Sequence, residues 1–245
     1  MNLVDSSDAE HMSNPALLAA LTTEHYTLQA SRSSTVVEAN GRSSLFLSAT
    51  SAATVALALV AQLDQLGDTF LAFALVVLPA LVVLGVTSYM RLADLAVQDA
   101  HYARAIGRIR AFYLTLDPAG RQYWMQPAGD DPHTIMRQAG EQHSRWHHFS
   151  HTATSVSAVT AVVSGALLGL VLSAFSPVPV AVVAVISTAV GSALFGATWL
   201  DQERRWRRSA RSEPTRFLPD GTPAAQAAEI AGPTSPPPLP VPAVA

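Results

Sequence analysis

The chain has 245 residues, of which 49% are hydrophobic and 13% are charged, and its formal net charge is −3. A balance this close to neutral argues against a nucleic-acid partner, because binding to a phosphate backbone needs a clear surplus of basic side chains. Cysteine is absent, which excludes thiolate catalysis, cysteine-ligated metal and a disulfide framework.

Residues 1–14 are polar, and we expect them to be disordered. Asn14 and Pro15 then open a helix, because Asn is a favourable N-cap and proline fits the first helical position. Leucines and His25 recur at helical spacing, which predicts an amphipathic cytoplasmic helix over residues 15–44. This part of the chain lacks the regions of a cleavable signal peptide, so the first apolar stretch is expected to direct insertion.

Residues 45–90 predict a transmembrane hairpin. The stretches 45–63 and 70–90 carry no charged side chain, and at about 1.5 Å per residue each can cross a hydrocarbon core of about 30 Å. The sequence QLDQLGDT between them has the Asp and Gly content of a turn at a membrane surface.

Small and hydroxyl side chains form two rows along the first of these stretches. The rows are Ser48, Ala52 and Ala56, and Thr50, Thr54 and Ala58. Such rows let helices in lipid approach closely and exchange hydrogen bonds. The alternative is that they line a water-filled path.

Beyond residue 90 the second predicted span continues as a cytoplasmic helix. Its side chains at alternating spacings of three and four are Leu92, Leu95, Asp99, Tyr102, Ile106, Ile109, Tyr113 and Leu116. This heptad seam is typical of a coiled coil, and we expect the helix over residues 15–44 to be its antiparallel partner. Asp99 is the single charge on the seam. It could pair with a His or Arg and fix the register, join a metal or catalytic site, or face solvent.

The rest of segment 91–151 contains a turn and a second helix opening. Asp117 and Pro118 end the long helix, and a polar loop follows. Asp131 and Pro132 then repeat the combination of an N-cap and a proline. A helix that starts there is expected to lead into the third span.

That helix would carry the sequence EQHSRWHHFSH, in which His143, His147 and His151 are spaced by four residues. Imidazoles one turn apart can bind Zn²⁺ or another transition metal, and Asp99 is a candidate further ligand at a similar depth below the membrane. Imidazole also titrates near neutral pH, so pH sensing is an alternative role. Without either role the cluster is a polar, aromatic-rich helix entering a membrane interface. The H-E-x-x-H pattern of zinc hydrolases is absent.

Residues 152–200 predict a second transmembrane hairpin, with a turn at 176–179. Gly165 and Gly169 form a G-x-x-x-G row in its first span. The second span carries small residues at similar spacing, namely Ser187, Gly191, Ser192 and Gly196. Small-residue rows are typical of close helix packing in lipid, and we expect a homo-oligomer.

Residues 201–245 comprise an Arg-rich juxtamembrane segment and a Pro-rich tail. Five arginines follow the last predicted span: Arg204, Arg205, Arg207, Arg208 and Arg211. We expect them to bind anionic lipid headgroups, because no nucleic-acid-binding fold or interleaved aromatic residues accompany them. Nine of the 16 prolines lie beyond residue 213, and the chain ends in SPPPLPVPAVA, which contains a P-x-x-P match. This tail after the arginines is predicted to be disordered, with a polyproline II bias.

The arginines also predict the orientation. Of the 15, two precede the first span, seven lie between the hairpins and six follow the last span, while the hairpin turns carry none. Basic residues collect on the cytoplasmic side, so both termini and the middle segment should be cytoplasmic in a multi-pass protein of the plasma membrane. The lysine-free, alanine-rich composition also indicates a bacterial source.

The predicted fold is all-α: an integral membrane four-helix bundle of two transmembrane hairpins with helical cytoplasmic extensions. The sequence has no phosphate-binding loop, no catalytic triad spacing and no ionisable residue within a span, which argues against an enzyme or a coupled transporter. We predict a non-enzymatic scaffold or sensor that acts through its cytoplasmic helices, without a cofactor and with a protein partner that the sequence does not identify. The alternatives are a small homo-oligomeric pore or channel, and a metal-binding membrane protein that uses the histidine cluster.

Overall fold

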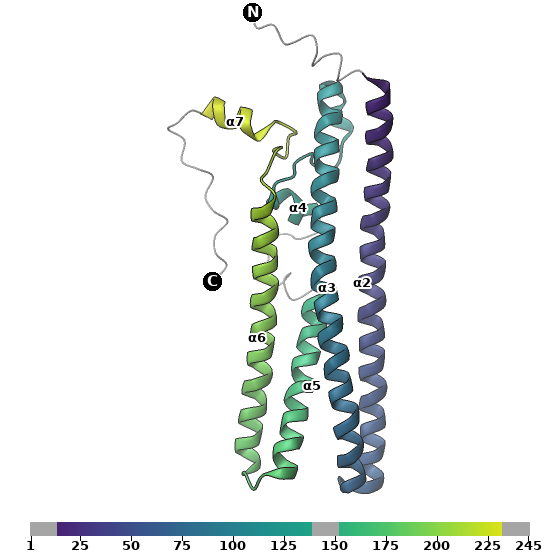
Figure 1. Cartoon of the computed structure of the whole chain (residues 1–245), viewed down its shortest axis with the longest axis vertical. Helices are drawn as coiled ribbons and strands as arrows, with labels where there is room; N and C mark the ends of the chain where they lie inside the picture. Colours follow the sequence, from purple (N-terminus) through teal and green to yellow (C-terminus); the bar gives the residue numbers. More distant parts are fainter. Residues whose placement is uncertain (1–13, 139–151, 232–245) are drawn as a thin grey trace, which may run out of the picture. The chain divides into compact units, whose positions relative to one another are not determined.

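The computed structural model describes residues 14–138 and 152–231, and every regular element in these ranges is helical (Figure 1). The elements are α2 (Pro15–Asp64), α3 (Asp68–Leu116), η1 (Pro118–Tyr123), α4 (Pro132–Gln138), α5 (Thr152–Phe175), α6 (Val180–Ser212) and α7 (Ala224–Ala231). The predicted all-α class is therefore confirmed for the described part of the chain.

The chain divides into two compact units. The polar unit comprises Met1–Ala30, His101–Gly140 and Glu213–Ala245. The apolar unit comprises Ser31–Ala100 and Glu141–Ser212. The helices α2 and α3 each supply residues to both units.

Four helices, α2, α3, α5 and α6, are long and apolar enough to cross a membrane. This finding confirms the four long apolar helices that the sequence predicts. Most side chains in their apolar stretches are not buried within the chain. Large aliphatic side chains such as Leu63 and Val180 are 87% and 80% exposed. The apolar unit therefore presents much of its aliphatic surface outward.

A tight turn joins α2 to α3. Gln65 and Leu66 adopt positive φ angles of 49° and 65°, and the Gly67 N–H donates to the Asp64 carbonyl at 2.9 Å. The Asp64 carboxylate accepts the Phe70 N–H at 2.9 Å and so caps the first turn of α3. The turn predicted from the Asp and Gly content is present, and its acidic residue holds the start of the next helix.

The core of the apolar unit lies where α2, α3 and α5 meet. Its buried side chains are Phe46, Tyr89, Leu92, Ala93, Leu95, Ala153 and Val156. Gly85 of α3 permits close approach, because a Cβ there would overlap Thr160 Oγ1 of α5 and lie 3.0 Å from Phe46 Cε2 of α2. The absence of a side chain at Gly85 therefore sets how closely the three helices pack.

Small residues bring α5 and α6 together. A Cβ on Gly165 would lie 2.9 Å from the Ser187 carbonyl oxygen, and one on Gly191 would lie 3.0 Å from the Ala161 carbonyl oxygen. The small-residue rows of the second hairpin thus pack against each other within one chain. Gly196 is outside this contact, since nothing lies within 4 Å of its Cβ position.

Hydroxyl groups in the apolar helices bond within their own helix. Thr50 and Thr54 each donate at 2.8 Å to the carbonyl four residues earlier, and Thr160 and Ser164 do so at 2.7 Å. These bonds satisfy the hydroxyls without water or a second helix. Of the two rows predicted on α2, Ser48, Ala52, Thr54 and Ala58 are exposed and only Thr50 and Ala56 are partly buried, so most of these positions lie outside the helix contacts within the chain.

The polar unit has a small apolar core of its own. Leu28 of α2 is buried against Ile106 and Ile109 of α3, and Leu21 and Tyr113 pack at its edge. Part of the predicted seam on α3 therefore contacts the N-terminal helix, as the sequence analysis expects.

The structure differs from the sequence interpretation after residue 200. The helix α6 continues beyond its apolar stretch to Ser212, because the Arg-rich sequence contains no glycine or proline to end it. Residues 213–231 are not a disordered tail, since Phe217 and Pro223 form a β-bridge that leads into α7. The prediction of disorder is wrong for this part, while 232–245 lie outside the described residues.

Candidate functional sites

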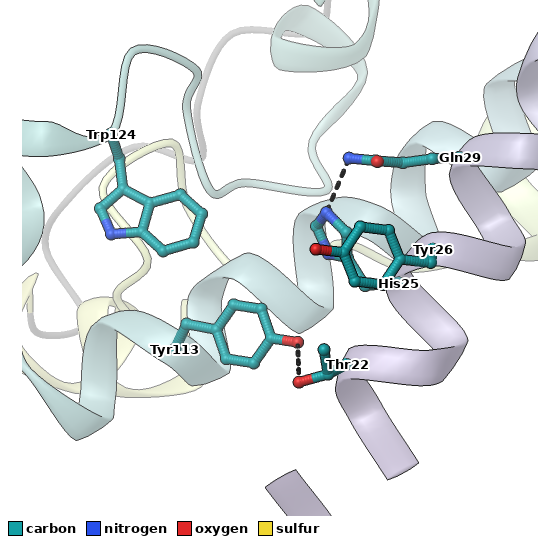
Figure 2. A pocket seen from close by; sticks show the side chains of 6 residues that line it. All are labelled: Thr22, His25, Tyr26, Gln29, Tyr113 and Trp124. Atoms are coloured by element: carbon teal, nitrogen blue, oxygen red, sulfur yellow. Dashed lines mark hydrogen bonds between the residues drawn. The ribbon is translucent and has the colours of Figure 1, made fainter. Parts of the chain in front are cut away.

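An aromatic groove lies in the polar unit (Figure 2). Six side chains line it: Thr22, His25, Tyr26, Gln29, Tyr113 and Trp124. Its volume of about 390 Å³ falls within the range of small-ligand sites, roughly 300–1,000 Å³.

Helical spacing and a short 3₁₀ helix position these side chains. On α2, His25 and Tyr26 are adjacent, and each lies three or four positions from Thr22 and from Gln29, so the four side chains share one face of the helix. Tyr113 projects from α3 within the seam. Trp124 is the C-cap of η1, where its backbone N–H donates to the Arg121 carbonyl at 3.1 Å. Asp117 fixes the start of η1 by accepting the Ala119 N–H at 3.0 Å.

Tyr113 lies between two other rings of the groove. Its ring centroid is 5.9 Å from that of His25 and 5.9 Å from that of Trp124, on which it is stacked at an interplanar angle of 29°. Tyr26 meets His25 edge-on at 6.4 Å. Tyr26 is 68% exposed and Trp124 is 41% exposed, so both rings are accessible to a ligand.

The surroundings of His25 in the groove favour the neutral form of its imidazole. The Gln29 side-chain amide nitrogen lies 2.8 Å from His25 Nε2. Burial lowers the pKa of His25, and the charge of Arg110 lowers it further. Arg110 also opposes the approach of a cation. The groove therefore suits a neutral ligand that can contact ring faces and accept hydrogen bonds from the Tyr26 hydroxyl and the Gln29 amide.

A buried carboxylate anchors the C-terminal segment of the polar unit. The Asp130 side chain has no exposed surface, and it accepts hydrogen bonds from the Arg216 and Phe217 N–H groups at 2.9 Å each. Arg108 Nε donates to the same carboxylate at 2.7 Å. Backbone bonds from Ala128 and Asp130 to this segment complete the attachment. The arrangement is structural, because every polar group in it is directed at the protein itself.

Ion pairs join three helices of the apolar unit. Glu38 of α2 accepts two hydrogen bonds from Arg91 of α3, at 2.8 and 2.9 Å, and Arg205 of α6 pairs with Asp94 of α3 and with Asp201. Arg91 and Arg42, which lies one turn after Glu38 on α2, lower the pKa of Glu38 to about 2. These charges flank the charge-free stretches of their helices. Three apolar stretches therefore end at a shared belt of ion pairs.

Of the residues of the predicted metal site, the structure describes only Asp99. Asp99 pairs with Arg32 through two hydrogen bonds, at 2.8 and 3.2 Å, which is the register-fixing contact among the roles considered for it. His143, His147 and His151 lie outside the described residues. In the part of the chain that the structure describes, no group of three His, Asp or Glu side chains is arranged to hold a metal ion.

The arginines predicted to contact lipid all lie on α6. Arg205 and Arg207 are held by acidic side chains of the chain itself. Arg204, Arg208 and Arg211 are exposed. The predicted cluster is therefore divided between ion pairs and outward-facing charges.

Sequence reasoning missed the groove and the role of Asp130. It assigned Tyr113 to the seam, and it placed Trp124 and Asp130 in a polar loop. The available signal was the pair of adjacent aromatic residues, Tyr123 and Trp124, in a stretch of otherwise polar character. No comparable local signal marks Asp130, because its partners are 22 and more residues away.

Comparison of the chain with protein families, curated proteins and solved structures found no match. Its function is therefore inferred from its own residues.

Proposed function

We propose that this chain is a multi-pass membrane protein whose polar unit serves as a non-enzymatic sensor or scaffold on the cytoplasmic side. The four apolar helices would cross the bilayer as two hairpins. Their outward aliphatic surface supports this, because exposing it to water costs about 25 cal/mol per Å². A lipid environment removes that cost.

The observation that carries the proposal is the belt of ion pairs on α2, α3 and α6. The contacts of Glu38 with Arg91 and of Asp94 with Arg205 bring the polar ends of three apolar stretches to one level. Charges gathered at one level beside charge-free stretches are the pattern of a membrane boundary. The two hairpin turns then belong to the opposite face.

The side on which each end lies follows from the arginines. All 15 lie outside the hairpin turns, and by the positive-inside rule this supports a cytoplasmic location for both termini and the polar unit. Arg204, Arg208 and Arg211 would reach anionic headgroups of the plasma membrane from there. The homo-oligomer has weaker support, because Gly165, Gly169 and Gly191 already pack between α5 and α6 within the chain.

A sensing or scaffolding role is proposed because the polar unit offers a ligand-sized groove but no catalytic arrangement among its described residues. The groove is formed by α2 and α3, which also supply the first hairpin. A ligand in the groove would contact both helices and could therefore change how α2 and α3 pack against each other.

Cysteine labelling tests the topology, since the chain has no cysteine of its own. A membrane-impermeant maleimide should label Leu66→Cys and Phe175→Cys in intact cells, because both positions are exposed next to hairpin turns. Met125→Cys, at a fully exposed position of the polar unit, should be labelled only after lysis. Labelling of residue 125 in intact cells would overturn the proposed orientation. Single-channel currents from the reconstituted protein would replace the sensor proposal with the pore.

A further inference from the structure

We propose that the aromatic groove of the polar unit binds the chain's own Pro-rich segment, residues 236–242 (PPPLPVP), in the polyproline II conformation. This inference extends beyond the membrane topology and does not depend on it. The Pro-rich segment would occupy the groove of its own chain and so compete with any other ligand for it.

The walls of the groove match what a polyproline II helix recognises. Pro-rich segments dock on aromatic-lined grooves because proline rings pack on aromatic faces and the preformed helix loses little entropy on binding. Tyr113 is stacked with Trp124 along the groove, and Tyr26 is largely exposed at its rim. Figure 2 shows the Trp124 ring and the side chains of His25 and Tyr26 on opposite sides of Tyr113.

The polar groups of the groove also fit this occupant. Proline has a carbonyl acceptor but no backbone N–H, and a polyproline II helix makes no internal hydrogen bonds, so its carbonyls need outside donors. The Tyr26 hydroxyl and the second N–H of the Gln29 amide supply donors at the groove. The Thr22 and Tyr113 hydroxyls already donate within the protein, to the Leu18 carbonyl and to Thr22 Oγ1.

The charge near the groove is also compatible with the Pro-rich segment as its ligand. The positive charge of Arg110, which acts on His25 in the groove, disfavours a cationic ligand. Residues 232–245 contain no charged side chain, so their approach carries no electrostatic penalty.

The length of the chain between its last contact with α3 and the segment allows the segment to reach the groove. Gly221, at a φ of +82°, lies against Leu114, which follows Tyr113 in α3. From there α7 extends about 12 Å, and the five positions from Ala231 to Pro236 span up to about 17 Å. A tether this short gives a local concentration in the millimolar range, which compensates for the modest affinity of a Pro-rich segment.

The test uses bimane fluorescence in the full-length protein, because tryptophan quenches bimane on contact. Bimane attached to Val241→Cys, the only cysteine in the chain, should be quenched. Trp124→Phe should abolish the quenching, and the matched control Trp206→Phe should leave it unchanged. Replacing Pro236, Pro237, Pro238 and Pro240 by alanine should abolish it as well. Tyr26→Ala removes an exposed groove residue without affecting the core and should weaken the quenching.

A synthetic peptide with the sequence of residues 232–245 should compete with the tethered segment and restore the fluorescence, whereas its proline-to-alanine version should not. Quenching that is equal in the parent protein and in Trp124→Phe would overturn the proposal. Quenching that persists in the alanine tail would exclude recognition of a polyproline II helix. Quenching that disappears on dilution would assign the groove to the segment of a second copy and overturn the intramolecular contact.

Discussion

Arg32 and Asp99 form a two-bond ion pair between α2 and α3, with Nε 2.8 Å from Oδ1 and Nη2 3.2 Å from Oδ2. The side chains are 23% and 24% exposed. The single charge of the α3 seam is thus neutralised by the facing helix. Only one relative register of the two helices brings these groups together, so the pair specifies how α2 and α3 align.

A double-mutant cycle should measure this pairing. Asp99→Asn and Arg32→Gln are expected to show a coupling of about 1 kcal/mol in the free energy of unfolding in detergent, because the bond is bidentate and partly buried. The control is Glu203 with Arg207, a pair within one helix whose side chains are 45% and 52% exposed. Its coupling should be about 0.3–0.5 kcal/mol. A coupling between Arg32 and Asp99 no larger than the control would contradict the assigned role.

Gly85→Ala should destabilise the apolar unit by about 1–3 kcal/mol, because the new methyl group overlaps Thr160 and approaches Phe46. Thermal loss of helical circular dichroism in detergent measures the effect. Gly196→Ala is the matched control. It meets nothing within 4 Å and should be neutral or stabilising by up to about 1 kcal/mol. Adding Thr160→Ala should restore part of the stability lost in Gly85→Ala, and absence of any rescue would locate the clash elsewhere.

Asp130→Asn should release the segment that precedes α7. The change removes the charge that pairs with Arg108 and should lower the free energy of unfolding by about 2 kcal/mol. The loss is smaller than for a fully buried pair, because Arg108 is partly exposed. Limited proteolysis is expected to cut between residues 213 and 231 sooner than in the parent protein. Glu229→Gln removes an exposed charge from α7 and should leave the cleavage rate unchanged. Equal rates for both variants would rule out Asp130 as the anchor.

The stability of the polar unit should decrease as the pH falls below about 6.5. Burial and Arg110 hold the pKa of His25 below its ordinary value of 6.5, so the unfolded chain takes up its proton first. The stabilisation is therefore complete above pH 6.5 and is lost as the pH falls through the pKa of the folded state. Melting temperatures between pH 5 and 8 should show this slope, and His25→Asn should reduce it.

Helix positions could be predicted from the sequence because their signals are local. Asn14 caps α2 by accepting the Ala16 N–H at 2.9 Å, and Asp131 caps α4 by accepting the Thr134 N–H at 2.9 Å. The predicted third span coincides with α5, Thr152–Phe175. Caps, prolines and apolar runs act over a few neighbouring residues, so the sequence by itself determined where these helices begin and how apolar they are.

Tertiary structure alone decided which distant groups meet. Asp99 was compatible with a metal site, an ion pair or solvent until Arg32, 67 positions away, was found against it. The groove brings Trp124 to Tyr113 and His25, and Asp130 holds backbone groups 86 and 87 positions further on. Such contacts leave no periodic trace, because they depend on how two helices align and where a loop returns, and these are properties of the packed chain.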